Sequence, residues 1–95
     1  MEKNRFVLKF DNQVTRLAGY PYGKTVFEEQ ISKDIDYEFL PITIEFPKHI
    51  IKAASSFTQG FFESLVENFG YNLLDNQVIL ICDGALLESI KDNLV

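Results

Sequence analysis

The residues with the clearest chemical potential are three hydroxyl side chains, Ser55, Ser56 and Thr58, where a long predicted helix begins. A hydroxyl at a helix start caps free backbone N–H groups, and Ser56 with Gln59 three residues later has capping-box spacing. As a nucleophile, Ser56 would need a base, and the chain's only histidine is His49. The serines are not set in a nucleophile elbow, so capping is favoured over catalysis.

Patterns for other catalytic or metal-binding chemistry are missing. One cysteine, Cys82, and one histidine cannot form a zinc site, and Cys82 is predicted to be a buried strand residue. Residues 19–23 match neither a phosphate-binding loop nor a dinucleotide fingerprint. No carboxylate pair can be placed in a cleft. The glutamates on predicted exposed helix faces are Glu28, Glu29, Glu63 and Glu67. We therefore predict a protein that is not an enzyme and needs no metal or cofactor.

Length and charge narrow the class of protein further. The 95 residues fit one domain, 1–95, and 46% of them are hydrophobic, which is enough for a folded core. The net charge is -5 and the basic residues are scattered, so nucleic acid and anionic membranes are disfavoured partners. The longest apolar run, residues 78–82, is too short to span a bilayer, and no signal-like stretch begins the chain. A cytoplasmic location is expected.

The strongest structural signal is a helix that ends at Gly70, a residue type favoured just after a helix. Apolar side chains recur at four-residue spacing, in Phe57, Phe61, Leu65 and Phe69. Phe62 widens this stripe, so either Phe61 or Phe62 is a candidate for an exposed contact with a partner or a second copy. Gly60 is expected to allow close packing of the helix against a sheet.

Other elements are predicted from apolar patterning. Strands are expected at residues 5–10, 42–46 and 78–82, with a less marked one at 14–17. The continuous apolar run 78–82 is typical of a strand buried on both faces. Residues 48–54 are expected to form a loop or short helical turn. Helices are predicted at residues 84–94, capped by Asp83, and at 21–32, whose expected buried face is Tyr22, Val26, Phe27 and Ile31.

Alternating strands and helices predict an α/β fold. We expect a mixed, mostly parallel sheet of three or four strands, with three helices packed mainly on one face. The other face is then partly open. Tyr20 and Tyr22 flank Pro21 and either pack at a sheet edge or form an exposed aromatic patch. The candidate partner contacts are Tyr20, Tyr22, Phe57 and Gln59.

The stretch ITIEFPKHIIKAASSFTQGFFESLVENFG resembles the STAS-like family, a relative of the sulfate-transporter and anti-sigma-antagonist domains. The similarity continues upstream in RLAGYPYGKTVFEEQI and downstream in VILICDGALLESIK, and so covers nearly the whole chain. Its most specific part is a strand, a short loop, the letters SSF and an aromatic-rich helix. The resemblance implies a STAS-like fold.

The resemblance also implies a switch. In the wider superfamily, a kinase with a histidine-kinase-type ATP site phosphorylates a Ser or Thr at the start of the helix after a central strand. The matching positions here are Ser55, Ser56 and Thr58. The anti-sigma-antagonist pattern has an acidic residue before the phosphorylated serine and a glycine after it. This chain departs from that pattern, because Ala54 precedes the serines and Phe57 follows them.

These observations favour a regulatory protein-interaction module with a protein partner, such as a histidine-kinase-type ATP-binding protein, or a second copy in a homodimer. Two alternatives stay open. One is a small anion- or nucleotide-binding domain that uses the N-terminus of the Ser55–Phe69 helix. The other is an acidic inhibitor protein of a mobile element.

Overall fold

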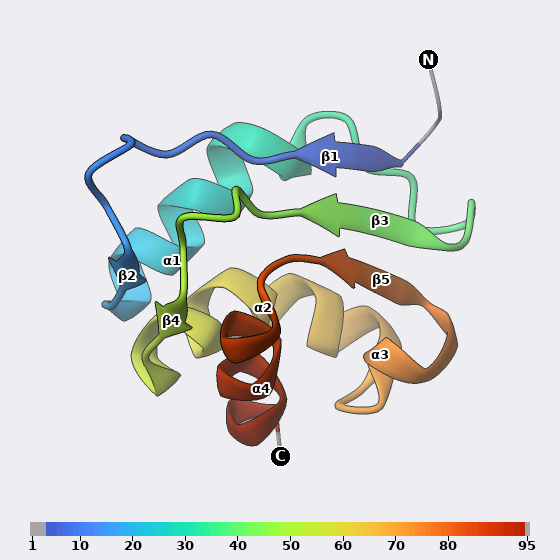
Figure 1. The fold of residues 1–95 in the computed structure, drawn as a ribbon. Helices are drawn as coiled ribbons and strands as arrows, with labels where there is room; N and C mark the ends of the chain where they lie inside the picture. Colours follow the sequence, from blue (N-terminus) through green and yellow to red (C-terminus); the bar gives the residue numbers. More distant parts are fainter. Residues whose placement is uncertain (1–3, 95) are drawn as a thin grey trace.

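Three parallel strands form the central sheet of the computed structural model, which describes residues 4–94. They are β1 (Arg5–Val7), β3 (Ile42–Glu45) and β5 (Val78–Ile81), in the spatial order β1-β3-β5 (Figure 1). In this register Ile44 lies between Phe6 and Leu80. The predicted α/β fold with a mostly parallel sheet is confirmed, and every strand pair in residues 4–94 is parallel.

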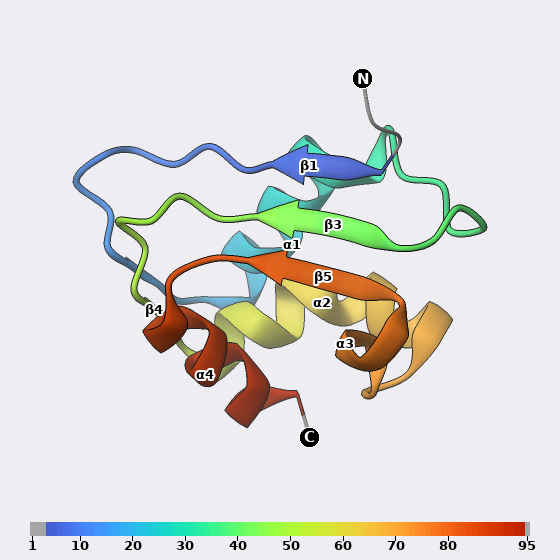
Figure 2. The same cartoon turned by 45° about the vertical axis from the view of Figure 1, so that its right-hand side comes forward.

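Only one face of the sheet is covered by helices (Figure 2). The alternation of side chains places Ile42 and Ile44 on the covered face, where both are fully buried. Val7, Ile79 and Ile81 lie on the open face and remain 58%, 47% and 39% exposed. The prediction that residues 78–82 are buried on both faces is therefore wrong. A continuous apolar run is compatible with one or two covered faces, and only the helix positions decide between them.

Two helices cover the buried face. The first is α1 (Tyr20–Phe27), which continues into a π-helical turn, η1 (Glu28–Ser32). The second is α2 (Ser55–Phe69), which ends before Gly70, where φ is +83° and a side chain would be strained. The fully buried side chains of α2 include Phe57, Phe61, Phe62 and Leu65. Phe61 and Phe62 are both core residues, so the expectation that one of them is exposed is wrong.

The remaining elements are short, apart from the last helix. β2 (Arg16–Leu17) pairs in parallel with β4 (Lys52–Ala53), so residues 48–54 contain a strand and not only the predicted loop. α3 (Leu73–Asn76) follows α2, and α4 (Gly84–Asn93) follows β5. The Asp83 carboxylate accepts a hydrogen bond from Ala85 N at 2.8 Å, which confirms the predicted cap of α4.

The last helix lies beside the β4 strand and α2. The Ser89 hydroxyl joins the two elements, since it donates to the Ala53 carbonyl at 2.7 Å and accepts from Ala53 N at 3.2 Å. This contact fixes the middle of α4 against β4, shortly before α2 begins. None of the helices within residues 4–94 has the length and apolar character needed to cross a membrane.

Candidate functional site

Two glycines bring the N-terminal halves of α1 and α2 into direct contact. A Cβ built on Gly23 would come within 2.8 Å of Phe61 N and clash with the Phe57 carbonyl. A Cβ on Gly60 would come within 3.1 Å of Lys24 N and clash with the Tyr20 carbonyl. Gly60 therefore packs against α1, which corrects the expectation that it packs against the sheet. The side chains at the starts of both helices consequently share one surface.

Ser56 links the two helix starts through its hydroxyl. Its Oγ accepts a hydrogen bond from Gly19 N at 2.9 Å, immediately before α1. The N-cap of α2 is Ala54, and no side chain caps this helix. The predicted capping box of Ser56 and Gln59 is therefore wrong. Gly19 has a φ of +103°. Its N–H donates to Ser56, which lies more than thirty positions later in the sequence.

The other predicted residues of α2 differ in accessibility. Ser55, the first residue of the helix, and Gln59 are exposed. Thr58 and Phe57 are fully buried. Thr58 is thus closed to a kinase in the folded domain, and the prediction that Phe57 contacts a partner is wrong. The exposed hydroxyl of the three is that of Ser55, while Ser56 is half-buried.

Tyr20 and Tyr22 lie on the first turn of α1, which packs against α2. They are 38% and 42% exposed, so Tyr22 does not belong to the buried face of α1 as predicted. The Tyr22 ring leans on the buried Phe57 ring, with 5.7 Å between the ring centroids. We define the tyrosine surface as Tyr20, Tyr22, Ser55 and Gln59.

Tyr20 also belongs to a charged cluster. Its hydroxyl donates a hydrogen bond to the Glu63 carboxylate, whose other oxygen lies 2.9 Å from Lys24 Nζ. The Lys24 ammonium is 5.8 Å from the centroid of the Tyr20 ring. The hydrogen bonds from Tyr20 and then Lys24 lower the pKa of Glu63, and the same carboxylate raises the pKa of both Tyr20 and Lys24. The cluster holds the Tyr20 ring in one place.

A groove of about 310 Å³ lies next to this cluster, between α2 and the C-terminal end of α4. We call it the α2–α4 groove. Thr58, Phe62 and Val66 line it from α2, together with the carboxylates of Glu63 and Glu67. Its other lining residues are Tyr20, Gln59, Tyr71, Asn93 and Leu94.

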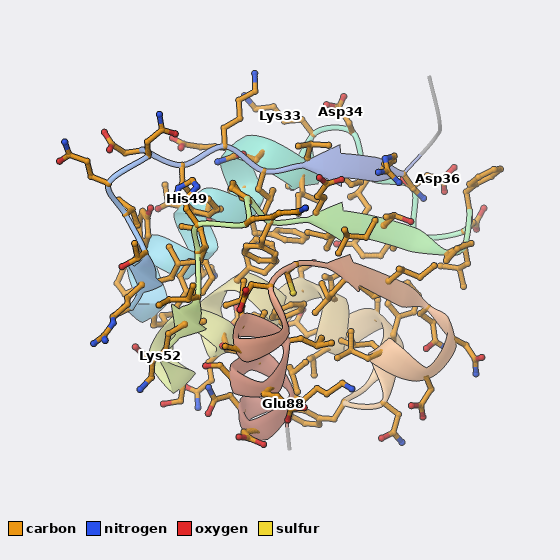
Figure 3. The ribbon with its side chains drawn as sticks, viewed as in Figure 1. Lys33, Asp34, Asp36, His49, Lys52 and Glu88 are labelled. Carbon is orange, nitrogen blue, oxygen red and sulfur yellow. The ribbon has the colours of Figure 1, made fainter. Side chains whose placement is uncertain are left out.

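The remaining residues considered from the sequence are not part of this site. His49 lies on the connection between β3 and β4 (Figure 3), and its Nε2 is 3.0 Å from the Asp11 carbonyl oxygen. Cys82 follows β5, and burial raises the pKa of its thiol. Between residues 4 and 94, no group of three or more His, Cys, Asp or Glu side chains is arranged to hold a metal ion.

Sequence reasoning missed the α2–α4 groove. Glu63 and Glu67 were assigned to an exposed helix face, and their four-residue spacing indicates that they share one side of α2. The sequence carries no signal that Asn93 and Leu94 would close the other side. Comparison of the chain with protein-family models, with curated proteins and with solved structures finds no match.

Proposed function

We propose that this domain is a regulatory protein-interaction module and not an enzyme, and that the tyrosine surface contacts the partner. The observation that carries the proposal is the pair of half-exposed rings, Tyr20 and Tyr22, at the start of α1. Tyrosine is enriched in protein interfaces because one side chain offers both apolar area and a polar group.

The two tyrosines have contacts within the domain that orient them before a partner arrives. The hydrogen bond and ion pair to Glu63 orient Tyr20, and the Phe57 ring supports Tyr22. Beneath them, the close contact of Gly23 with α2 leaves little room for the helices to shift. A surface that is already ordered loses less conformational entropy on binding, which favours specific recognition.

Regulation by phosphorylation is the second part of the proposal, with Ser55 as the acceptor. Ser55 is the exposed hydroxyl of the three candidates, and it is the first residue of the fifteen-residue helix α2. A phosphate there would be stabilised by the free N–H groups at the helix start. It would also add about two negative charges to an acidic protein. We expect this charge to weaken partner binding. The STAS-like resemblance suggests a histidine-kinase-type ATP-binding protein as the kinase.

The test is quantitative capture from a lysate of the source cells, with bound proteins measured by mass spectrometry. Four baits are compared: the unaltered protein, Tyr22→Ser, Ser55→Asp and the control Ser32→Asp. Ser32 is exposed at the end of η1, so the control adds the same charge away from the tyrosine surface. Circular dichroism establishes that all four baits are folded.

The proposal predicts a protein that the unaltered and Ser32→Asp baits capture equally. Tyr22→Ser and Ser55→Asp are expected to lose most of it. Equal capture by all four baits would contradict the proposed surface. If Tyr22→Ser loses the captured protein and Ser55→Asp does not, the tyrosine surface is supported as the contact and regulation by Ser55 phosphorylation is contradicted.

A further inference from the structure

Three sources of negative charge meet at the α2–α4 groove. Two are the carboxylates of Glu63 and Glu67, which line it from one side of α2. The third is the C-terminal end of α4, where the last helical residue, Asn93, and the following Leu94 line the opposite side. The final carbonyl groups of a helix carry a partial negative charge. Lys24 pairs with Glu63, whereas Glu67 makes no ion pair within residues 4–94. The groove therefore favours a cation.

A buried hydroxyl at the groove lacks a partner. Thr58 is fully buried and lines the groove, and its Oγ1 forms no hydrogen bond within residues 4–94. A threonine inside a helix usually bonds the carbonyl four residues earlier, which here is that of Ala54. That carbonyl accepts the backbone N–H of Thr58 at 3.1 Å, and Oγ1 adds no second hydrogen bond to it. Unpaired buried polar atoms are rare, so this one in the groove wall calls for an explanation, such as a bound water or ion.

Further groups around the groove suit an ammonium on an alkyl stem. The Asn93 side-chain nitrogen donates to the Ala53 carbonyl at 3.3 Å, which leaves its oxygen as an acceptor. Tyr20 and Tyr71 supply aromatic rings, which attract cations. Phe62 and Val66 supply apolar surface for methylene groups. The groove thus combines acceptors, negative charge and an apolar wall.

We propose that the α2–α4 groove binds an alkylammonium group, presented by a lysine side chain of a partner protein or by a free alkylamine. Binding of a partner's lysine side chain rests on the proposed interaction function, whereas binding of a free alkylamine does not depend on it. Both sources share one chemistry: three N–H donors and a positive charge at the end of a flexible apolar chain.

The test is an NMR titration of the ¹⁵N-labelled full chain with three probes. The probes are N-acetyl-lysine methylamide, its Nζ-acetylated form and 1,5-diaminopentane. We expect the two amines to shift backbone signals of Thr58, Glu67, Tyr71 and Asn93 in a saturable manner. The Nζ-acetylated compound lacks the charge, so we expect it to leave these signals in place.

Variants assign the binding to named groups. Glu67→Gln should weaken amine binding at least about threefold, as for an exposed charge pair. The control Glu29→Gln removes the same charge from η1 and should leave the dissociation constant unchanged. Thr58→Val should weaken binding about tenfold. It should also raise the melting temperature of the free protein, because it removes an unpaired buried hydroxyl.

Binding of both amines supports the site. Binding of 1,5-diaminopentane alone also supports it, and shows that the ligand is a free alkylamine and not a lysine side chain. The proposal is overturned if neither amine shifts the groove signals, or if the Nζ-acetylated probe binds equally well. Because Glu67→Gln is a surface change, this test holds even if Thr58→Val fails to fold. The titration involves no partner protein, so its result is independent of the capture experiment.

Discussion

Glu63 is the residue on which the tyrosine surface and the α2–α4 groove both depend. Its carboxylate accepts hydrogen bonds from Tyr20 and Lys24 and also lines the groove. Both contacts stabilise the charged form of Glu63, which is why its pKa is lowered. A change at Tyr20 therefore alters the electrostatics of the groove as well as the surface that faces a partner.

We predict that Tyr20→Phe raises the pKa of Glu63 toward the usual value for glutamate. The largest cause of the lowered pKa is the Tyr20 hydrogen bond, and phenylalanine lacks the hydroxyl. ¹³C NMR titration of the Glu63 carboxyl measures the change, and Tyr22→Phe, which makes no contact with Glu63, is the control. A lowered pKa stabilises the fold above the glutamate pKa of the unfolded chain, and this contribution disappears as pH falls through the lowered value. An unchanged Glu63 midpoint in Tyr20→Phe would contradict the assignment.

Single residues could be predicted from the sequence when their partners are local. The Asp83 cap involves Ala85, two positions away, and the left-handed Gly70 follows the last turn of its own helix. The Ser56 hydroxyl has the same capping chemistry, yet it bonds Gly19 N on another element. No local pattern reveals that choice, because it depends on where α1 crosses α2.

At the scale of elements, the contact between α1 and α2 depends on two positions without side chains, Gly23 and Gly60. Each faces backbone atoms of the other helix. Backbone cannot move aside as a flexible side chain can, so a methyl group at either position must push the helices apart. The tyrosine surface spans both helices and would be disturbed with them.

We predict that Gly60→Ala destabilises the protein by about 2–3 kcal/mol, since overpacking outweighs the gain in helix propensity. Gly84→Ala is the matched control, because Gly84 is also helical and has open space where a Cβ would lie. We expect that change to be neutral or to stabilise by up to about 1 kcal/mol. Urea denaturation gives both free energies of unfolding, and equal values for the two variants would contradict the close contact.

Long, periodic elements were predictable. Of the shortest ones, β2 was indicated by the less marked strand at residues 14–17, whereas β4 and α3 were not indicated. The spacing of Phe57, Phe61, Leu65 and Phe69 predicted α2 nearly to its ends, because each turn of the helix turns an apolar side chain toward the core. β4 contains two residues and α3 contains four, so each spans about one period of its structure and offers no repeat to recognise. The α2–α4 groove was missed for a related reason, since Asn93 and Thr58 meet only through tertiary packing.

For the molecule as a whole, shortening an isoleucine side chain should reduce stability more on the covered face of the sheet than on the open face. Ile44 is fully buried under α1 and α2, whereas Ile79, paired with the neighbouring Thr43, stands on the open face. We predict that Ile44→Ala costs about 3 kcal/mol of stability and Ile79→Ala less than about 1 kcal/mol. Thermal denaturation of the two variants measures the difference. A large loss from Ile79→Ala would show that the open face is covered in solution.

The all-parallel pairing has a consequence for how the chain reaches this structure. Among the strands of residues 4–94, no two consecutive ones form a hairpin, since Arg5 pairs with Thr43 and Ile42 pairs with Val78. Each pairing closes a long loop, which slows folding relative to sheets built from neighbouring strands. One edge of β3 pairs with β1, and its other edge pairs with β5, which lies much later in the chain. Until β5 docks, the folding chain therefore presents an unpaired edge of β3, which can template unwanted strand pairing.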